Sequence, residues 1–452
     1  MDNTTTTELG VSNHRQNGTD ATAIGQFDRG DSQSDIQSQN QEFYLPPVDR
    51  GRDAWLFLAA AFIVEMLVWG FPFAFGVFQE YYGTHAPFAD SGKIAIIGTC
   101  AMGIMYLSAP LIFGLLQRFP KTRTPAIGVG LVTMSLALGL SSLSTTVTHL
   151  IVSQGILYAI GGGLVYAPTI LFMDEWFVNK KGFAFGVMWA GTAFGGIVIP
   201  ILLQYLLSTH GFRTTLRVWV IVLFVFTVPL TYFLKPRLPI SQTAHQRRFN
   251  LSFLTNRTFL LLQAGNIVEA LGYFIPSIYL PSYARTLGAS VSLSTLPVIL
   301  FNVASVFGCV AMGSITDKYH VTTCILLSTI GSTVGVFVIW GLASTFPVLF
   351  VFCVVYGLFA GSFSSTWPGV IRAVQREERG VDPSMVFACL AAGRGIGNVA
   401  CGPLSEALVH NHAWMGDASG AYGSGYGTLV VFTGVTAMLG GVGVLGRRVG
   451  WV

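Results

Sequence analysis

The stretch IVEMLVWGFP, Ile63–Pro72, recurs two hundred residues later as IVEALGYFIP, Ile267–Pro276. Both copies place a glutamate, Glu65 or Glu269, inside a long apolar run, with a proline seven residues further on. A second set of small residues repeats at nearly the same offset, with Ala190, Gly191 and Gly195 corresponding to Ala392, Gly393 and Gly397. The two repeats together predict that the chain is a duplicated helical bundle.

The composition predicts that this bundle lies in a membrane. Apolar residues make up 52% of the chain, charged residues only 10%, and the mean hydropathy is +0.61. Such a balance is typical of a polytopic helical membrane protein, and the 52 glycines suit close packing of helices in lipid. The net charge of +4 is modest and its basic residues form no groove-like patch, so we expect no nucleic-acid partner.

The apolar stretches define the predicted organisation of the chain. Residues 1–48 are polar and without periodicity, which predicts a disordered tail and no cleavable signal peptide. Residues 49–234 and 258–452 each hold six stretches long enough to span a bilayer, and residues 235–257 link the two halves. The twelve predicted spans cover residues 55–78, 93–116, 124–143, 150–173, 182–206, 216–234, 258–283, 291–315, 321–342, 348–373, 383–409 and 426–445. The fold class is therefore all-α, with twelve transmembrane helices in two pseudo-symmetric halves.

The positions of lysine and arginine predict the orientation. If the tail and the linker face the cytoplasm, only Lys93, Arg213, Arg217 and Arg285 lie on the opposite side, and every other basic residue outside the spans is cytoplasmic. This asymmetry predicts that both termini are cytoplasmic. We expect the plasma membrane as the location, with a vacuolar or vesicular membrane as the alternative.

Three ionisable residues lie well inside the predicted spans. Glu65, Glu269 and Arg394 each stand ten or eleven residues from the cytoplasmic start of their helix, which is roughly 15 Å and half the hydrocarbon thickness. A charge at that depth costs about 2.5–3.5 kcal/mol on insertion scales, so each should face a cavity or a partner. Midplane polar groups in a duplicated bundle are typical of secondary transporters.

One segment resembles a known family signature. The stretch WFVNKKGFAFGVMWAGTAFGG, which begins at Trp176, resembles the fifth-span signature of the monocarboxylate-porter family of the major facilitator superfamily. The places that match are Trp176, Phe177, Lys180, Lys181, Ala184, Gly186, Ala190, Gly191 and Gly195, whereas Phe185 stands where asparagine is usual. The segment RGRDAW, Arg50–Trp55, is similar to the family's second signature in a degenerate form that looks like the fungal branch.

The resemblance implies a fold but not a substrate. The superfamily's loop pattern is present as Gly313, Asp317 and Lys318, which would act as a gating loop, while the corresponding first-half loop has Gln117 and no acid. The family's lactate carriers use a helix 1 lysine and an Asp/Arg pair in helix 8. Those places hold Phe73, Ser305 and Cys309 here. The resemblance therefore does not support proton–lactate symport.

Polar and aromatic residues near the three charges are the candidate ligand groups. Arg394 and Asn398 share one helix face, as do Asn266, Glu269 or Ala270, and Tyr273. Thr192 takes the place of Arg394 in the first half. The predicted substrate-binding or coupling residues are Glu65, Trp69, Asn266, Glu269, Tyr273, Trp367, Arg394 and Asn398. Arg394 would bind an anionic or carbonyl-rich ligand and a glutamate would carry a proton. The alternatives are a purely structural ion pair and aromatic side chains that merely pack.

Glycines of the fifth span, Gly186, Gly191, Gly195 and Gly196, are interpreted as one smooth packing face. The six cysteines lie in apolar segments without metal-ligand spacing, and His410 and His412 are interpreted as a solvated pair, so no metal is expected.

The predicted function is secondary active transport of a small organic molecule, anionic or polar-aromatic, by alternating access, with protons as a candidate coupling ion. No nucleotide-binding loop and no cofactor motif is present, and no grouped catalytic side chains indicate an enzyme. We favour export of a secondary metabolite. The alternatives are uptake of a monocarboxylate or vitamin-like nutrient, and a membrane nutrient sensor that does not transport. A monomer is expected.

Overall fold

The computed structural model describes residues 45–89, 91, 93–238, 251–409 and 414–448, without the side chains of Val291, Ser292, Leu445 and Arg448. Most of the predicted tail, the middle of the linker, and His410 and His412 lie outside the described residues. Residues Pro46–Val452 form one compact unit, separate from Met1–Leu45, and that unit alone is described below.

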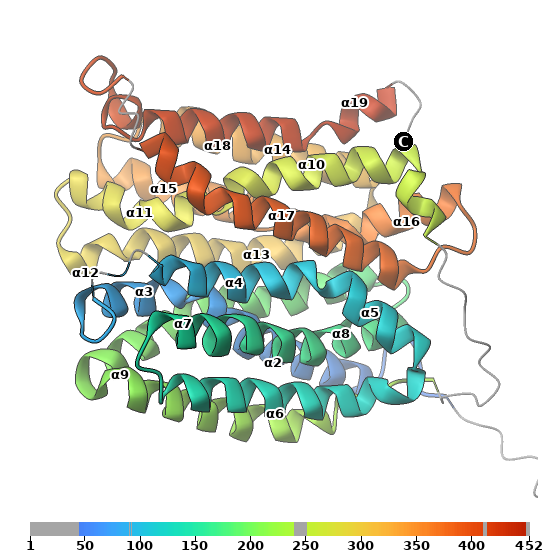
Figure 1. Cartoon of the computed structure of the whole chain (residues 1–452). Helices are drawn as coiled ribbons and strands as arrows, with labels where there is room; N and C mark the ends of the chain where they lie inside the picture. The colour runs from blue at the N-terminus through green and yellow to red at the C-terminus, as the bar shows by residue number, and fades with distance from the viewer. Residues whose placement is uncertain (1–44, 90, 92, 239–250, 410–413, 449–452) are drawn as a thin grey trace, which may run out of the picture. The chain divides into compact units, whose positions relative to one another are not determined.

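Every regular element among the described residues is a helix, and the long helices run side by side along one direction (Figure 1). The first half contains α2 (Arg52–Phe73), α3 (Phe75–Thr84), α4 (Ile94–Leu107), α5 (Ala109–Arg118), η1 (Pro120–Thr122), α6 (Arg123–Ser141), α7 (Val147–Leu150), η2 (Ile151–Leu157), α8 (Tyr158–Trp176) and α9 (Lys181–Thr231). The second half contains η3 (Ser252–Thr255), α10 (Arg257–Tyr273), α11 (Ile275–Thr286), α12 (Val291–Ser294), α13 (Leu296–Lys318), α14 (Val321–Val334), η4 (Gly335–Trp340), α15 (Phe346–Phe359), η5 (Phe363–Thr366), α16 (Trp367–Glu377), α17 (Pro383–Val409), η6 (Gly420–Gly423), α18 (Gly427–Gly440) and α19 (Gly443–Arg448).

The described residues contain nine helices long and apolar enough to cross a membrane, or ten when the bent pair α4–α5 is taken as one span. The 51-residue α9 is interrupted at Gly211, whose φ of 74° and ψ of 171° are not helical, so it supplies two spans. The 14-residue α18 is apolar but shorter than the other spans. The described residues thus supply ten spans by length and composition, and counting the second part of α9 and the short α18 as spans would bring the number to the predicted twelve.

Both copies of the opening repeat bend at their proline. The α2–α3 break lies at Ala74, just after Pro72, and the α10–α11 break lies at Phe274, just before Pro276. Proline has no N–H and leaves a carbonyl one turn earlier without its helical donor. The hydroxyl of Tyr158 donates to the Val68 carbonyl at 2.9 Å, and Tyr356 donates to the Tyr273 carbonyl at 3.3 Å. In the first half Tyr158 thus supplies the donor that Pro72 removes. In the second half Pro276 frees the carbonyl of Gly272, and Tyr356 donates to the next carbonyl, that of Tyr273, at the same break.

The glycines of α9 do not form one face, so that interpretation was wrong. A Cβ on Gly191 would lie 2.3 Å from the Phe62 carbonyl oxygen of α2, whereas one on Gly186 would lie 2.4 Å from the Cys309 carbonyl oxygen of α13. Because five residues turn a helix by about 140°, the two glycines point in different directions. One set of glycines packs α9 within its own half and the other packs it against the second half.

The two halves contact each other along two helix pairs. The first pair is α9 and α13, where Gly182 and Gly313 approach so closely that neither position has room for a Cβ. The second pair is α4 and α17, where a Cβ on Gly395 would lie 2.6 Å from the Cβ of Tyr106. Close approach of backbones at small residues is the usual way to pack helices in lipid.

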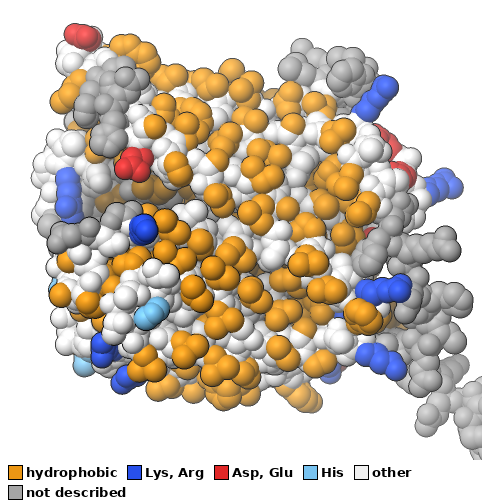
Figure 2. Space-filling view, viewed as in Figure 1, with side chains coloured by type: hydrophobic (Ala, Val, Ile, Leu, Met, Phe, Trp, Pro, Cys, Tyr) orange, Lys and Arg blue, Asp and Glu red, His pale blue; other side chains and the backbone are white. Residues whose placement is uncertain are grey.

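The surface of the bundle has an apolar middle and charged ends. In Figure 2 hydrophobic side chains cover the central part of the visible face, and lysine and arginine side chains lie toward the two ends. Large apolar residues such as Leu111, Phe307 and Ile221 are more than half exposed. Apolar exposure over this extent fits contact with lipid tails, because a multi-pass membrane protein has no need to hide it. We call the end that carries Asp317 the Asp317 end.

Replacing Gly191 with valine should destabilise the first half by about 1–3 kcal/mol, since the new side chain must displace the α2 backbone. The thermal midpoint of the detergent-solubilised protein measures this loss. Gly128→Val is the matched control, because a Cβ at that exposed position of α6 meets nothing within 4 Å. Equal midpoints for the two variants would contradict the packing described for α2 and α9.

Candidate functional site

The three buried ionisable residues lie in two equivalent side-chain pairs, one in each half, and the first-half pair includes the neutral Thr192. In the second half a guanidinium nitrogen of Arg394 on α17 lies 2.8 Å from Oε2 of Glu269 on α10. In the first half the Thr192 hydroxyl of α9 donates to Oε1 of Glu65 on α2 at 3.1 Å. The sequence repeat places Thr192 where the second half has Arg394, so the same helix pair carries an ion pair in one half and a neutral donor in the other.

Arg394 lies in a shell of aromatic rings. Its guanidinium carbon is 4.4 Å from the Tyr273 ring centroid and 5.9 Å from that of Phe274. Only 3% of Arg394 and 6% of Glu269 is exposed. Tyr106 of α4 packs against Trp69 of the first half and, at Gly395, against α17 of the second half, one residue from Arg394. Cation–π contacts strengthen when they are shielded from water, so the rings stabilise a buried cation that has a single acidic partner in the described part of the chain.

Two of the predicted ligand residues mainly hold helices together. The Asn266 amide donates to the Leu390 carbonyl at 2.9 Å and accepts from the Trp367 indole at 3.3 Å. Gln263 likewise donates to the Cys389 carbonyl at 2.7 Å. The side chains of Asn266 and Gln263 therefore both donate to backbone carbonyls of α17 about one turn before Arg394. Asn266 and Trp367 thus bind each other, and Asn266 binds the α17 backbone, so neither polar group is free for a ligand.

The remaining two predicted residues have different surroundings. Trp69 is buried against Tyr106, with ring centroids 4.4 Å apart, and against Tyr166 at 5.3 Å, while its indole nitrogen has no partner among the described residues. Asn398 is half-buried, and its side chain makes no hydrogen bond within the part of the chain that the structure describes. Trp69 occupies in the first half the place that Tyr273 occupies beside Arg394.

An aromatic cluster lies between the charged pairs and the Asp317 end. The sequence did not lead us to predict it. Trp189 of α9 stacks on Phe387 of α17, with centroids 6.1 Å apart and planes at 10°, and Phe185 lies 5.6 Å from Phe387. Trp367 and Phe113 contact the same ring. Phe185 and Phe387 occupy equivalent places in the repeat, so the internal repeat was the signal that could have identified the cluster.

Asp317 joins the halves in a way that the gating-loop pattern predicts only in part. Its carboxylate accepts from the backbone N–H groups of Gly182 at 2.6 Å and Phe183 at 2.8 Å, which lie in the first turn of α9. An acid at a helix N-terminus is stabilised by unpaired amides and the helix dipole. Arg372 pairs with Asp317 at 3.3 Å, whereas Lys318 is exposed and forms no ion pair in the described region.

The first half uses a different residue for the equivalent contact. Its loop has no acid, but the Gln117 amide donates to Oδ1 of Asp382 at 2.9 Å. Asp382 in turn accepts from the Ser384 backbone amide at the start of α17. At this contact the acid, Asp382, stands at the start of α17, the helix that it stabilises. Gln117 of the other half supplies the contact across the halves. These contacts tie the two halves together at the Asp317 end.

A segment before α2 is bound to the same end. Asp49, which is 5% exposed, accepts from the backbone amides of Val178, Asn179 and Lys180 at 2.9–3.0 Å. Burial alone would raise the pKa of Asp49, but these amides favour the charged form, and the net effect is a pKa below its ordinary value of 3.8. The carboxylate thus fixes the loop between α8 and α9 to the start of the first span.

All six cysteines are free, and no group of three potential metal-ligating side chains occurs among the described residues.

The Major Facilitator Superfamily sequence model matches residues 57–398, and it matches again over residues 262–448. The chain belongs to the Major Facilitator Superfamily. It is accordingly a multi-pass membrane transporter of a small molecule, and not an enzyme. The second match begins within α10, the helix that carries the second copy of the repeat.

Several curated relatives of this superfamily member are fungal transporters. The chain is 26% identical to the "MFS transporter asaE" of Aspergillus flavus, over 89% of this chain and 88% of the relative. It is 26% identical to the "Fujikurins efflux protein" of Gibberella fujikuroi, over 89% and 84%. It is 28% identical to the "Aspyridones efflux protein apdF" of Emericella nidulans, over 89% and 79%.

The fold is also similar to that of a solved superfamily structure. The human organic anion transporter MFSD10 (TETRAN) superposes with a TM-score of 0.65 at 11% sequence identity, covering 87% of this chain and all of that chain. At this identity the similarity supports the superfamily fold, which confirms the predicted fold class.

Replacing Glu269 with glutamine should destabilise the protein by about 3–5 kcal/mol, because it leaves the Arg394 guanidinium buried without an anion. The double variant Glu269→Gln, Arg394→Gln should recover part of this loss, since it removes the unpaired charge as well. Thermal midpoints in detergent measure both effects. Glu65→Gln is the matched control, because its amide oxygen can still accept from Thr192. Equal losses in the two single variants would contradict the difference between the halves.

Asp49→Asn should lower the thermal midpoint at neutral pH by an amount equivalent to about 1–3 kcal/mol, because charged acceptors bind backbone amides more strongly. Since the folded-state pKa lies below the unfolded one, this stabilisation is present at neutral pH and is lost as pH falls through the folded pKa, below about pH 4. The wild type and the variant should therefore converge at acid pH. Asp53→Asn, at an exposed position of α2, is the control, and a constant difference across pH would count against this role.

Proposed function

We propose that this transporter belongs to the monocarboxylate-porter branch of the superfamily and exports a small organic anion, a secondary metabolite with aromatic or carbonyl-rich character. The observation that carries this proposal is the Arg394–Glu269 pair, which is buried beneath two aromatic rings. The equivalent pair in the first half has Thr192 in place of the arginine. A buried arginine in a transporter bundle is costly, and such residues commonly mark the substrate path.

Arg394 has the chemistry to bind a carboxylate or an enolate. Its planar guanidinium offers five N–H donors, and one nitrogen is engaged with Glu269. A substrate anion would compete with Glu269 for these donors and gain charge-assisted hydrogen bonds. The rings of Tyr273 and Phe274 beside the guanidinium would contact a flat substrate at the same time. The pair is therefore an exchange site, in which the substrate replaces an internal acid.

The same exchange offers a route to proton coupling. When a substrate takes over Arg394, Glu269 would remain in a buried site without its cation, and uptake of a proton would remove the unpaired charge. Glu65 is already in that situation, because a hydroxyl is its hydrogen-bond partner. Protons are thus the coupling ion that these side chains favour.

Alternating access requires that the contacts at the Asp317 end break and form again in each transport cycle. Asp317 on α13 and Gln117 on α5 each hold a contact across the halves at this end. The aromatic cluster around Phe387 closes the path between that end and Arg394. We infer that the Asp317 end is cytoplasmic, because the basic residues gather there, and that the protein acts as a monomer in the plasma membrane.

Export is favoured by the names of the relatives. Several relatives are described as efflux proteins. A cytoplasmic Asp317 end would then admit the substrate when its contacts open. The places that the family's lactate carriers fill with charges hold Phe73, Ser305 and Cys309, which disfavours a lactate-like cargo.

A comparative metabolite profile tests the proposal. Cells lacking the gene should accumulate a compound inside and release less of it than cells with the gene. Arg394→Gln should reproduce the deletion, with at least a tenfold loss of release, because a charged hydrogen bond contributes about 1.5–3 kcal/mol. Arg217→Gln, at the opposite end of the bundle, is the control.

Two outcomes would contradict the proposal. A compound left unused in the medium by the deletion strain would indicate uptake of a nutrient instead. Normal release by a well-expressed Arg394→Gln protein would reduce the Arg394–Glu269 pair to a structural contact.

A further inference from the structure

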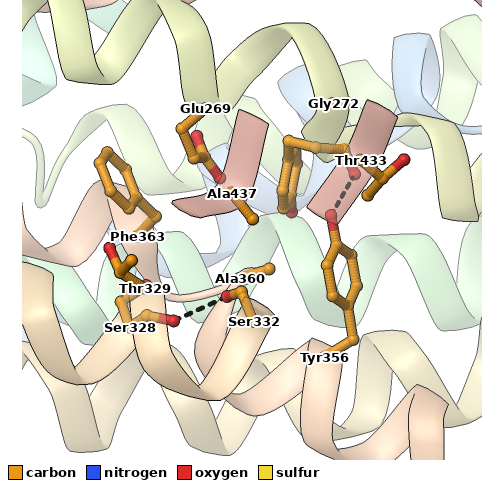
Figure 3. A pocket seen from close by; sticks show the side chains of 11 residues that line it. Glu269, Gly272, Ser328, Thr329, Ser332, Tyr356, Ala360, Phe363, Thr433 and Ala437 are labelled. Atoms are coloured by element: carbon orange, nitrogen blue, oxygen red, sulfur yellow. Dashed lines mark hydrogen bonds between the residues drawn. The ribbon is translucent and has the colours of Figure 1, made fainter. Parts of the chain in front are cut away.

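Two hollows in the described part of the chain differ in size and in setting. Figure 3 shows an enclosed cavity in the second half, lined among others by Glu269, Thr329 and Tyr356, whose volume of about 10 Å³ is too small for a ligand. The other hollow is an open groove on the first half with a volume of about 220 Å³. We call it the α2–α9 groove, because the residues that line it come from the start of α2 and from the segment just after α9: Arg52, Asp53, Leu56, Tyr232, Phe233 and Lys235.

The α2–α9 groove lies at the Asp317 end of the bundle, at the level of a membrane surface. The Lys235 carbonyl accepts from the Trp176 indole at 3.0 Å, and Asp49 binds the loop that follows Trp176. Trp55 on α2 and Tyr232 in the groove are both exposed, and such rings gather where hydrocarbon meets the lipid headgroups. The groove therefore lies where headgroups of the adjacent leaflet would contact it.

The groove contains two cations and one acid that have no charged partner in the described structure. Arg52, Asp53 and Lys235 are exposed, and none of the three forms an ion pair with another described residue. The Lys235 ammonium lies 5.8 Å from the Tyr232 ring centroid, and this contact holds the cation beside the groove. Two positive charges and one negative charge leave the groove with a net charge of +1.

An apolar strip leads from the groove toward the middle of the bundle. Its exposed side chains recur at spacings of three or four residues and so share one face of α9: Ile221, Phe224, Val225, Val228 and Tyr232. From the first of these residues to the last, the helix rises roughly 16 Å, which is close to half the thickness of the hydrocarbon layer. An acyl chain whose headgroup occupies the groove can therefore lie along this strip over the depth of one leaflet.

We propose that the α2–α9 groove binds the headgroup of one phosphatidylserine molecule, and that an acyl chain of this lipid lies along the apolar strip. The headgroup carries a phosphate, a carboxylate and an ammonium, so its two negative charges and one positive charge are the reverse of those in the groove. Arg52 and Lys235 bind the two anionic groups, and Asp53 binds the ammonium.

Size and charge both separate this lipid from other occupants. The groove is smaller than the roughly 300–1,000 Å³ of sites that enclose a drug-sized molecule, so it fits a headgroup better than a whole transport substrate. A headgroup with several phosphates fits less well, because the Asp53 carboxylate would repel it. Phosphatidylserine belongs to the cytoplasmic leaflet, so its access to the groove rests on the cytoplasmic placement of the Asp317 end in the proposed function.

Thermal midpoints of the full chain, delipidated and in detergent, test which molecule binds. Dioleoyl phosphatidylserine added to the micelles should raise the midpoint by roughly 2–5 °C, because a ligand of the folded state stabilises it. Dioleoyl phosphatidylglycerol has no ammonium and should give a smaller shift, and dioleoyl phosphatidylcholine, which has no net charge, should give none. Phospho-L-serine should also give none, since it has no acyl chain. Equal shifts with the serine and glycerol lipids, or a full shift with phospho-L-serine, would overturn the proposal.

Substitutions in the groove test where the lipid binds. Arg52→Gln and Lys235→Gln should each weaken phosphatidylserine binding roughly fivefold to tenfold, since each removes one charged contact. Both positions are exposed, so the variants should have the wild-type midpoint without lipid. Arg118→Gln is the matched control, because Arg118 is an exposed cation that follows Gln117 at the same end but does not line the groove.

Asp53→Asn tests the contact with the ammonium. This variant should lose the preference for phosphatidylserine over phosphatidylglycerol while its midpoint without lipid is unchanged, because Asp53 is exposed and forms no ion pair in the described region. A retained preference, equal weakening by Arg118→Gln, or unweakened binding in both cation variants would overturn the site. These readouts need no transport substrate, so normal export by Arg394→Gln would refute the proposed function and leave the lipid site standing.

Discussion

An arginine buried inside a transmembrane helical bundle must be neutralised by a neighbour, and that requirement organises the second half of this transporter. Arg394 is held by Glu269 at 2.8 Å and covered by Tyr273 and Phe274. Asn266, bound to the α17 backbone, fixes the two helices at the same level. Because a buried pair of opposite charges is stable only with good geometry, the surrounding helices have little freedom to shift while the pair is intact.

The first half shows what the same scaffold becomes without the cation. Glu65 meets Thr192 in place of an arginine, and Trp69 stands where Tyr273 lies. A site built from two identical halves would present the same side chains to both ends of a ligand, so recognition of an asymmetric ligand requires that the halves differ. The difference is concentrated at this level, whereas both halves have a tyrosine, Tyr158 or Tyr356, that donates to a backbone carbonyl beside the helix break. The two halves thus share the tyrosine contacts at the helix breaks and differ in the charges beside them. In a common fold, the residues that differ are the ones that can set ligand specificity.

Much of the fold was predictable because lipid imposes simple rules on a sequence. Spans must be apolar and long enough, so their number and limits follow from hydropathy. The repeat around Glu65 and Glu269 gave the pseudo-symmetry, and the depth of Arg394 in its span marked it as costly. The site was predictable only as a set of residue types. Asn266 and Trp367 were expected as ligand groups, yet the structure engages them with each other and with α17.

The sequence by itself determined the membrane class, the duplication and the presence of three ionisable residues inside the apolar spans, because composition and periodicity are local properties of the chain. Only the tertiary structure decided which charges meet, since Glu269 and Arg394 are far apart in sequence and depend on the crossing of α10 and α17. It also decided that α9 packs its glycines on two partners, and that Asp317 caps α9 across the halves. Packing between helices is set by shape at the contact, and no single helix carries that information.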